Sequence, residues 1–395
     1  MRALALFLPA LLSIAAHAAP PPRMDPATLL ADPRATQGEF ELTGVRTPSG
    51  GSVSLQLTPF EVWTADAEVI VVGADGVERA QPIPETAFFR GHIQGDPASR
   101  VYLSVEPDGT STGLVRHPLG ALHSLVASPT SDGIGLNLLP VDMDAMAAGR
   151  PAFQCQQGRL PETPVATGSP SASAEPASAP TPDGTLYRAR LAIDSDWEFR
   201  QRFASAAAAT TYIGNLVGYA STIYIDQLDT QLQVSYSRVF DNSSDPYTQT
   251  DSLCALYEFG KHWNDNFGST SRTIAHFVSG KNSGGGVAWL GVLCNGAFNV
   301  NATDAACPAG GPTGTSNYGG GYGFTGSMTG SFNPSAPTAV WDIVAFAHEV
   351  GHNFNSPHTH CYRNVGGNAN AVDTCYGQEQ DAACHAGSNS LPGTA

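Results

Sequence analysis

The chain has 395 residues, enough for two folded domains with connecting segments, and 42% of its residues are hydrophobic, enough for ordinary cores. Charged residues make up only 14%, and the formal net charge is −16 at pH 7. A chain so acidic and so poor in Lys and Arg has few groups that could neutralise phosphates. We therefore expect no binding of nucleic acid and no stable association with a membrane.

The N-terminus has the pattern of a secretory signal peptide. Arg2 supplies a positive charge, residues 3–16 form a short and mostly apolar stretch, and Ala16-His17-Ala18 gives an A-x-A cleavage site. The alternative is a membrane anchor, but the apolar stretch is too short to span a bilayer comfortably. We therefore expect residues 1–19 to be removed and the mature protein to be secreted, either extracellular or periplasmic in transit.

Residues 20–159 have the pattern of a β-rich domain. Residues 52–57 and 101–105 alternate between apolar and polar side chains, and residues 67–72 are a further strand candidate. Residues 160–184 consist mainly of Pro, Ala, Ser, Thr and Gly, which cannot bury a core. They are therefore predicted to be a linker that is open to proteases.

From residue 185 onwards the patterns of strands and helices alternate, which predicts a mixed α/β (α+β) domain over residues 185–395. Residues 308–337 are expected to be a Gly- and Ser-rich loop. The last helix is expected to begin near Thr338 or a few residues earlier, with Asp342 near its first turn, where a carboxylate suits the helix dipole. The other predicted elements are strands at 187–193, 232–239, 274–278 and 286–293, and helices at 197–226 and 254–267.

The last helix carries a candidate metal site. His348 and His352 are four residues apart and therefore lie on one face of the helix, where they can share a metal ion. Glu349 stands beside the first ligand and can take a proton from an activated water. His358 can be the third ligand only if the chain leaves the helix and turns back, and Asn355 suits that turn because Asn tolerates a positive φ.

An HExxH motif alone arises by chance fairly often in long chains. A third His at a suitable distance, in a chain with only 11 His residues, makes a chance match much rarer. The remaining alternative is a surface helix with incidental histidines. We therefore interpret His348, His352 and His358 as ligands of Zn²⁺ and Glu349 as the catalytic residue.

The three-His arrangement resembles that of the metzincin zinc endopeptidases, whose pattern is HExxHxxGxxH. This chain has Asn355 where the pattern has Gly, a conformationally mild change. The order of elements is most similar to that of the adamalysin/reprolysin group. The resemblance implies a mixed, mostly parallel sheet with an HExxH active-site helix. It also implies that strand 286–293 is an edge that pairs with substrate backbone, and an ordinary covered strand is the alternative.

The resemblance extends to the N-terminal half. Residues 89–96, Phe-Arg-Gly-His-Ile-Gln-Gly-Asp, are similar to a segment found in the pro-domains of the same group. Residues 20–159 are therefore expected to be a pro-domain, and a generic β-sandwich module that binds something is the alternative.

Metzincins carry a methionine turn after the third His, whereas all five Met residues of this chain precede His358. We therefore expect the sequence to end before that turn, so that domain 185–395 is C-terminally incomplete. A complete protein with a reduced site is the alternative.

Six of the seven Cys residues follow residue 250, and export favours disulfide bonds among them, although their connectivity cannot be read from the sequence. The spacing of Cys361, Cys375 and Cys384 suggests bridges that brace the loop after His358. Cys155 stands apart, just before the linker. In related latent enzymes a pro-domain thiolate fills the open position on the zinc, and this resemblance makes Cys155 a candidate latency ligand of a zymogen. A cysteine without that role is the alternative.

Taken together, the sequence predicts a secreted zinc metalloendopeptidase that acts on protein or peptide substrates. The alternative from another class is a secreted binding or adhesion protein that retains a catalytically weak zinc fold. The intact Glu349 favours the enzyme.

Overall fold

The structure is a computed structural model that describes residues 21–33, 38–118, 120–130, 133–141, 154–161, 184–302, 307, 311–332 and 341–361. The predicted signal peptide, most of the predicted linker, and Cys375 and Cys384 lie outside these residues. The expected start of the last helix near Thr338 lies outside them too. In the described part of the chain, none of the helices combines the length and the apolar character needed to cross a bilayer.

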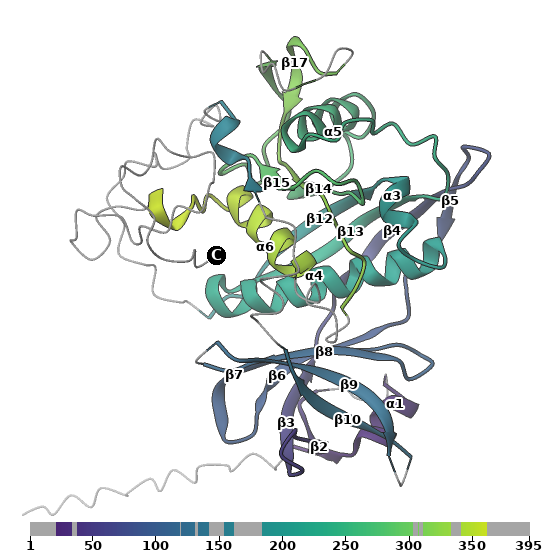
Figure 1. The fold of residues 1–395 in the computed structure, drawn as a ribbon, viewed down its shortest axis with the longest axis vertical. Coiled ribbons are helices and arrows are strands. Elements are labelled where there is room, and N and C mark those ends of the chain that lie inside the picture. Colours follow the sequence, from purple (N-terminus) through teal and green to yellow (C-terminus); the bar gives the residue numbers. More distant parts are fainter. Residues whose placement is uncertain are drawn as a thin grey trace, which may run out of the picture.

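The first half of the chain forms a sheet that closes on itself, drawn in purple and blue below the other layers in Figure 1. Its elements are β1 (Arg23–Met24), α1 (Pro26–Ala31), β2 (Phe40–Arg46), β3 (Ser52–Pro59), β6 (Ala87–Ile93), β7 (Asp96–Val105), β8 (Ser111–Arg116), β9 (Leu122–Thr130) and β10 (Gly133–Pro140). The strands neighbour one another in the order β1-β2-β10-β9-β8-β7-β6-β3, and the additional pairing of β2 with β3 closes the sheet. Alternating apolar residues such as Leu42, Leu55 and Leu103 point inward and are fully buried.

The segment that resembles pro-domains forms β6 and the turn to β7. Gly91 of β6 is paired with Leu57 of the antiparallel neighbour β3, and a Cβ at this position would be 1.8 Å from the carbonyl oxygen of Gln56. Only glycine allows the two backbones to approach so closely.

The second sheet is mixed and contains strands from both halves of the chain. In spatial order it contains β11 (Gln154–Cys155), β15 (Gly285–Ala288), β18 (Tyr322–Thr325), β14 (Ile274–Val278), β12 (Tyr187–Ser195), β13 (Thr230–Phe240), β4 (Trp63–Val72) and β5 (Glu78–Gln81). The β15–β18 and β4–β5 pairs are antiparallel, and the other pairs are parallel. The predicted mixed α/β architecture is confirmed.

Helices cover both faces of this sheet. They are α3 (Trp197–Arg200), α4 (Ala206–Leu228), α5 (Ser252–Asn266) and α6 (Trp341–Asn353), with 3-10 turns η1 (Gln157–Arg159) and η2 (Thr359–Cys361) and a small hairpin of β16 (Phe298–Ala302) and β17 (Gly314–Gly319). α4 and α6 share one core with residues such as Leu191, whereas α5 packs in a second core with residues such as Phe277. Figure 1 shows α5 on the opposite side of the sheet from α4 and α6.

Three details of the expected secondary structure are wrong. The single helix 197–226 is two helices, because Ser205 has an extended backbone and its hydroxyl caps α4 by accepting a hydrogen bond from the Ala208 N–H. The strand 286–293 ends at Ala288, because the chain turns at Gly291 with φ +66°. The expected loop 308–337 contains β17 and β18, and β18 supplies an inner strand of the sheet.

The boundary predicted between residues 159 and 185 stays a prediction, but strands from both sides of it share one sheet. β4, β5 and β11 come from the N-terminal side, and they pair with β13 and β15. Nothing in the periodicity of residues 67–72 indicated that this strand would leave the closed sheet.

Candidate metal centre

The site is built on α6 and on the turn that follows it. Asn355 has φ +70°, as predicted for the reversal. The Asn355 N–H donates to the His352 carbonyl, and the Ser356 N–H donates to the Gly351 carbonyl, at 2.9 and 3.0 Å. These two bonds form a Schellman motif with Asn in the left-handed position, which ends the helix and returns the chain toward His358.

The structure brings His348, His352 and His358 together. The Nε2 atoms of His348 and His352 are 3.1 Å apart, and those of His348 and His358 are 3.3 Å apart. Two nitrogens that each lie 2.0–2.1 Å from one tetrahedral zinc ion would be about 3.3 Å apart. Three ring nitrogens held at this spacing therefore suit a shared cation.

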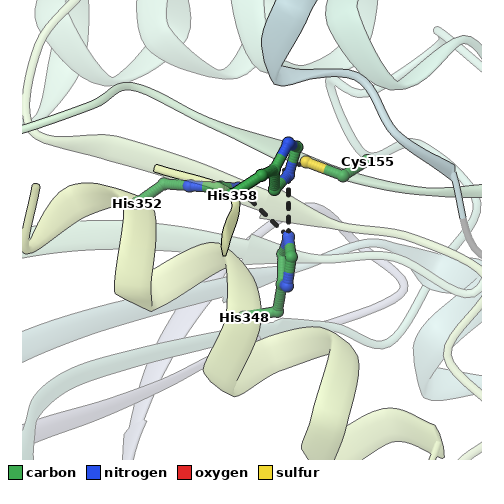
Figure 2. Close-up of side chains that lie close together, drawn as sticks. All are labelled: Cys155, His348, His352 and His358. Atoms are coloured by element: carbon green, nitrogen blue, oxygen red, sulfur yellow. Dashed lines mark hydrogen bonds between the residues drawn. The ribbon is translucent and has the colours of Figure 1, made fainter. Parts of the chain in front are cut away.

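The fourth corner of this group is Cys155 from β11. Its Sγ lies 3.2 Å from Nε2 of His352, and one ligand atom from each of the four residues lies within 4.8 Å of every other. Figure 2 shows the sulfur pointing from the neighbouring strand toward the imidazole rings. Cys155 is buried and carries a thiol instead of a disulfide. Three imidazoles and one thiolate are a donor set that suits Zn²⁺.

The protein orients the imidazoles through their outer nitrogens and through burial. Nδ1 of His352 lies 2.7 Å from the Ser356 carbonyl oxygen, so that Nδ1 donates and Nε2 keeps its lone pair for a metal. Burial, followed by the proximity of His352 and His358, lowers the pKa of His348 well below its ordinary value. The neutral ring is the form that binds a metal.

Glu349 is fully buried beside β15, which is not the expected edge, because β11 pairs with it on one side and β18 on the other. A Cβ at Gly286 would lie 2.6 Å from both Cγ and Oε1 of Glu349, so the carboxylate is packed directly against the strand backbone. The charge of Glu349 also raises the pKa of Tyr224, after the larger effect of burial, and the Tyr224 hydroxyl donates to the Ala347 carbonyl at 2.9 Å.

Asp342 anchors the first turn of α6. The Tyr212 hydroxyl of α4 donates to its carboxylate at 2.5 Å, and the backbone N–H groups of Thr329 and Gly330 donate at 2.9–3.0 Å. Burial raises the pKa of Asp342. The sequence placed Asp342 near the helix dipole, but no local signal indicated that it also joins α4 to the loop before α6.

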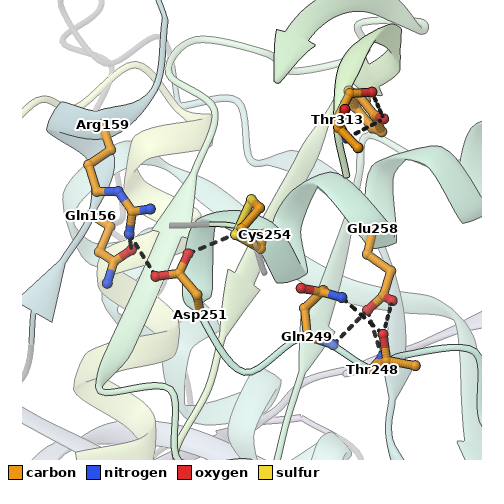
Figure 3. The surroundings of a disulfide bond; sticks show 10 residues. Gln156, Arg159, Thr248, Gln249, Asp251, Cys254, Glu258 and Thr313 are labelled. Atoms are coloured by element: carbon orange, nitrogen blue, oxygen red, sulfur yellow. Dashed lines mark hydrogen bonds and ion pairs between the residues drawn. A yellow bond between two sulfur atoms is a disulfide. The ribbon is translucent and has the colours of Figure 1, made fainter. Parts of the chain in front are cut away.

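A second contact holds the Cys155 segment on the sheet. The Gln156 N–H donates to the Gly286 carbonyl at 3.0 Å, and Arg159 Nη1 donates to Asp251 Oδ2 at 2.8 Å. Asp251 also caps α5, which carries the disulfide of Cys254 with Cys307 (Figure 3). Sequence reasoning did not identify Arg159, because an isolated arginine near a linker has no distinguishing pattern.

Comparisons with known proteins identify the family but add little detail about structure. A search of curated proteins gives no significant match. Among solved structures, metalloproteinase-II from Bacteroides fragilis is similar, with 11% sequence identity, 89% of this chain and 92% of that chain covered, and a TM-score of 0.43. The profile of metallo-peptidase family M12 (Reprolysin_5) matches residues 185–391. Since the match takes in more than half of the chain, the chain belongs to metallo-peptidase family M12.

Proposed function

We propose that the protein is a secreted zinc-dependent endopeptidase made as a latent precursor. The observation that carries the proposal is the spacing of the three Nε2 atoms of His348, His352 and His358, at 3.1 and 3.3 Å for the two closest pairs. Such a cluster of ring nitrogens is unfavourable without a cation between them. The family match supports peptide-bond hydrolysis as the reaction class.

His348, His352 and His358 would hold the metal, and Cys155 would fill the remaining position in the precursor. When bound, Zn²⁺ supplies Lewis acidity that polarises the scissile carbonyl and lowers the pKa of water toward about 7. Glu349 takes the proton from the attacking water and passes it to the leaving amine. The buried surroundings of Glu349 exclude bulk water and strengthen its electrostatic effect on the reacting atoms.

The contacts of β11 support Cys155 as the latency ligand. β11 pairs with β15 beside the candidate metal centre, so extended substrate could not pair with the same edge at the same time. A thiolate in the fourth position excludes the reactive water. Peptide hydrolysis by the uncut Cys155→Ser precursor would support this role. A variant precursor as inactive as the wild-type precursor would overturn it.

Secretion is proposed because residues 1–19 have the pattern of a signal peptide. The proposed partners are protein or peptide substrates. The protein is proposed not to bind nucleic acid or to associate stably with a membrane, on the basis of its charge of −16. Disulfide bonding fits an oxidising compartment: Cys254 is bonded to Cys307, and Cys361 is also disulfide-bonded.

The test combines metal content with hydrolysis of casein or a quenched fluorescent peptide. Glu349→Gln should keep stoichiometric zinc and lose nearly all activity, because the ligands remain and the base is gone. His352→Ala should lose both, and phenanthroline should abolish wild-type activity. If the activated wild-type protein binds zinc but hydrolyses nothing, the secreted binding protein is the better description. If it holds no stoichiometric metal, the proposed site is wrong.

A further inference from the structure

The sheet that carries the candidate metal centre has strands of the N-terminal segment, defined here as residues 20–159, at both of its edges (Figure 1). At one edge, the described residues of β11 pair with β15 as Gln154 with Gly285 and Cys155 with Gly286. At the other edge, β4 runs along β13 up to the pair of Phe240 with Val72. Among the described residues, the attachment through β4 is the longer of the two.

Backbone and side-chain amide groups of β13 bind the two residues that precede β4. The Val234 N–H donates to the Val62 carbonyl at 2.8 Å. The side-chain amides of Gln231 and Gln233 both donate to the carbonyl of Glu61, at 2.5 and 3.1 Å. All residues of β13 are buried in this arrangement. Removing β4 would expose an edge strand with unpaired N–H and C=O groups.

Charged side chains add to this attachment. Both guanidinium Nη atoms of Arg190 donate to the carboxylate of Asp66, at 2.9 and 3.0 Å. Arg238 Nη2 lies 3.3 Å from the Glu78 carboxylate of β5. The Asp66 and Glu78 side chains are 68% and 48% exposed, so these pairs contribute modestly and can be altered without disturbing a core.

A face of α4 receives large side chains of the N-terminal segment. Gly214 and Gly218 are one turn apart, and a Cβ at Gly214 would meet the Trp63 indole at 3.0 Å. A Cβ at Gly218 would meet Tyr102 at 3.0 Å, and the Tyr102 hydroxyl donates to the Asn215 carbonyl at 3.1 Å. The two glycines form a groove filled by aromatic rings, and the rings belong to a core shared by both halves of the chain.

We propose that the β13 edge and the Gly214–Gly218 face of α4 form a docking surface that keeps the N-terminal segment bound after the linker is cut. Cys155 precedes the linker in the chain, so a cut within residues 160–184 leaves it attached to β4. The docked segment then holds Cys155 beside the metal centre at a high effective concentration, although the described residues of β11 contribute only two residue pairs. A single linker cut therefore does not activate the enzyme. This last consequence rests on the proposed peptidase function, whereas the docking itself does not.

The experiment uses the full chain with a recognition sequence for a site-specific protease inserted between residues 162 and 183. After complete cutting under native conditions, gel filtration measures whether the two fragments co-elute. Thiol labelling measures the exposure of Cys155, which is the only cysteine of the N-terminal fragment. A second variant carries an additional recognition sequence between residues 142 and 153, so that two cuts excise the Cys155 segment and leave β4 attached to its closed sheet.

We expect the singly cut fragments to co-elute, Cys155 to label at least 10-fold more slowly than in urea, and peptide hydrolysis to remain at the level of the uncut precursor. The doubly cut protein should lose the Cys155 peptide, retain the N-terminal fragment and gain activity. Separation of the fragments after the single cut would overturn the proposal. Co-elution without any hydrolysis by the doubly cut, zinc-loaded protein would support the docking surface and count against the proposed function instead.

Charge-neutralising variants test the attachment at this edge of the sheet, because Asp66 pairs with Arg190 of β12 and Glu78 pairs with Arg238 of β13. Asp66→Asn and Glu78→Gln should each raise the dissociation constant of the singly cut fragments by up to about fivefold, the usual effect of losing an exposed ion pair. Asp108→Asn makes the same charge change in a turn of the closed sheet and should leave the constant unchanged. Equal effects of all three substitutions would overturn the assignment of the surface.

Discussion

The strongest test of the catalytic geometry is the substitution Gly286→Ala. The added Cβ would lie 2.6 Å from Cγ and Oε1 of Glu349 and 2.7 Å from Cδ. Ordinary contact between such atoms requires about 3.5–4 Å, so the carboxylate must move by about 1 Å. A misplacement of about 1 Å can lower a rate about 100-fold. Zinc content should not change, because Gly286 contributes no ligand.

The assay is hydrolysis of a fluorescent peptide by protein from which the Cys155 segment has been excised by two engineered cuts, with zinc measured on the same samples. Gly296→Ala is the matched control, because a Cβ at Gly296 meets nothing within 4 Å. We expect kcat to fall about 100-fold in Gly286→Ala and to stay within about twofold in Gly296→Ala.

A double-mutant cycle separates displacement of Glu349 from general damage to β15. In a Glu349→Ala background the side chain ends at Cβ, so neither Cγ nor the carboxylate fills the space beside residue 286, and the residual activity can be compared. Adding Gly286→Ala to that background should therefore cost much less than 100-fold, since the two positions interact directly. If the loss is equally large in both backgrounds, or if Gly286→Ala alone is fully active, the steric argument is refuted.

Two further predictions concern latency and pH. Arg159→Ala removes the bond to Asp251 and should let Cys155 react with thiol reagents about fivefold faster in the uncut precursor, whereas an unchanged rate would mean that the pair does not hold β11. Burial lowers the pKa of His276 to about 3 from 6.5, so its stabilising contribution is present above pH 6.5 and is lost as the pH falls toward 3. At pH 5 the loss of unfolding free energy is about 2 kcal/mol. The His276→Gln variant has no such titration, and its amide can still bond to Thr325. Urea unfolding should therefore show a smaller decrease in unfolding free energy between pH 7 and pH 5 for the variant than for wild type. Parallel pH profiles for the two proteins would contradict this reasoning.

Four elements, β12, β13, β14 and α5, could be predicted because their signals are local. β14 occupies the predicted residues 274–278, and β12, β13 and α5 differ from their predicted ranges only at the ends. β18 could not be predicted, because a strand containing Gly323 in a Gly-rich stretch has the composition of a loop. The structure gives the reason for that glycine, since a Cβ there would lie 2.7 Å from Nδ1 of His276. Close packing beneath α6 therefore requires Gly323, the same residue that makes the sequence of β18 look like a loop.

The pairing of strands from distant parts of the chain could not be predicted from the sequence. Residues 67–72 have the alternation of a strand, and nothing in them specifies β13 as the partner instead of the closed sheet. The same holds for the two residues of β11, which are too few to give any periodicity. Such pairings depend on how the loops place each strand, and a single sequence does not encode that in a local pattern.

The candidate site depends both on local sequence signals and on pairing between distant strands. His348, His352 and His358 lie within one helix and its turn, so helical spacing and the left-handed Asn355 already bring their rings together. Cys155 is separated from His352 by 197 positions and reaches it only because β11 pairs with β15. Chemistry and family resemblance pointed to this thiol, whereas its position depends on the fold. The thiol is therefore close enough to share a metal with the three imidazoles, and its role as a latency ligand stays a proposal.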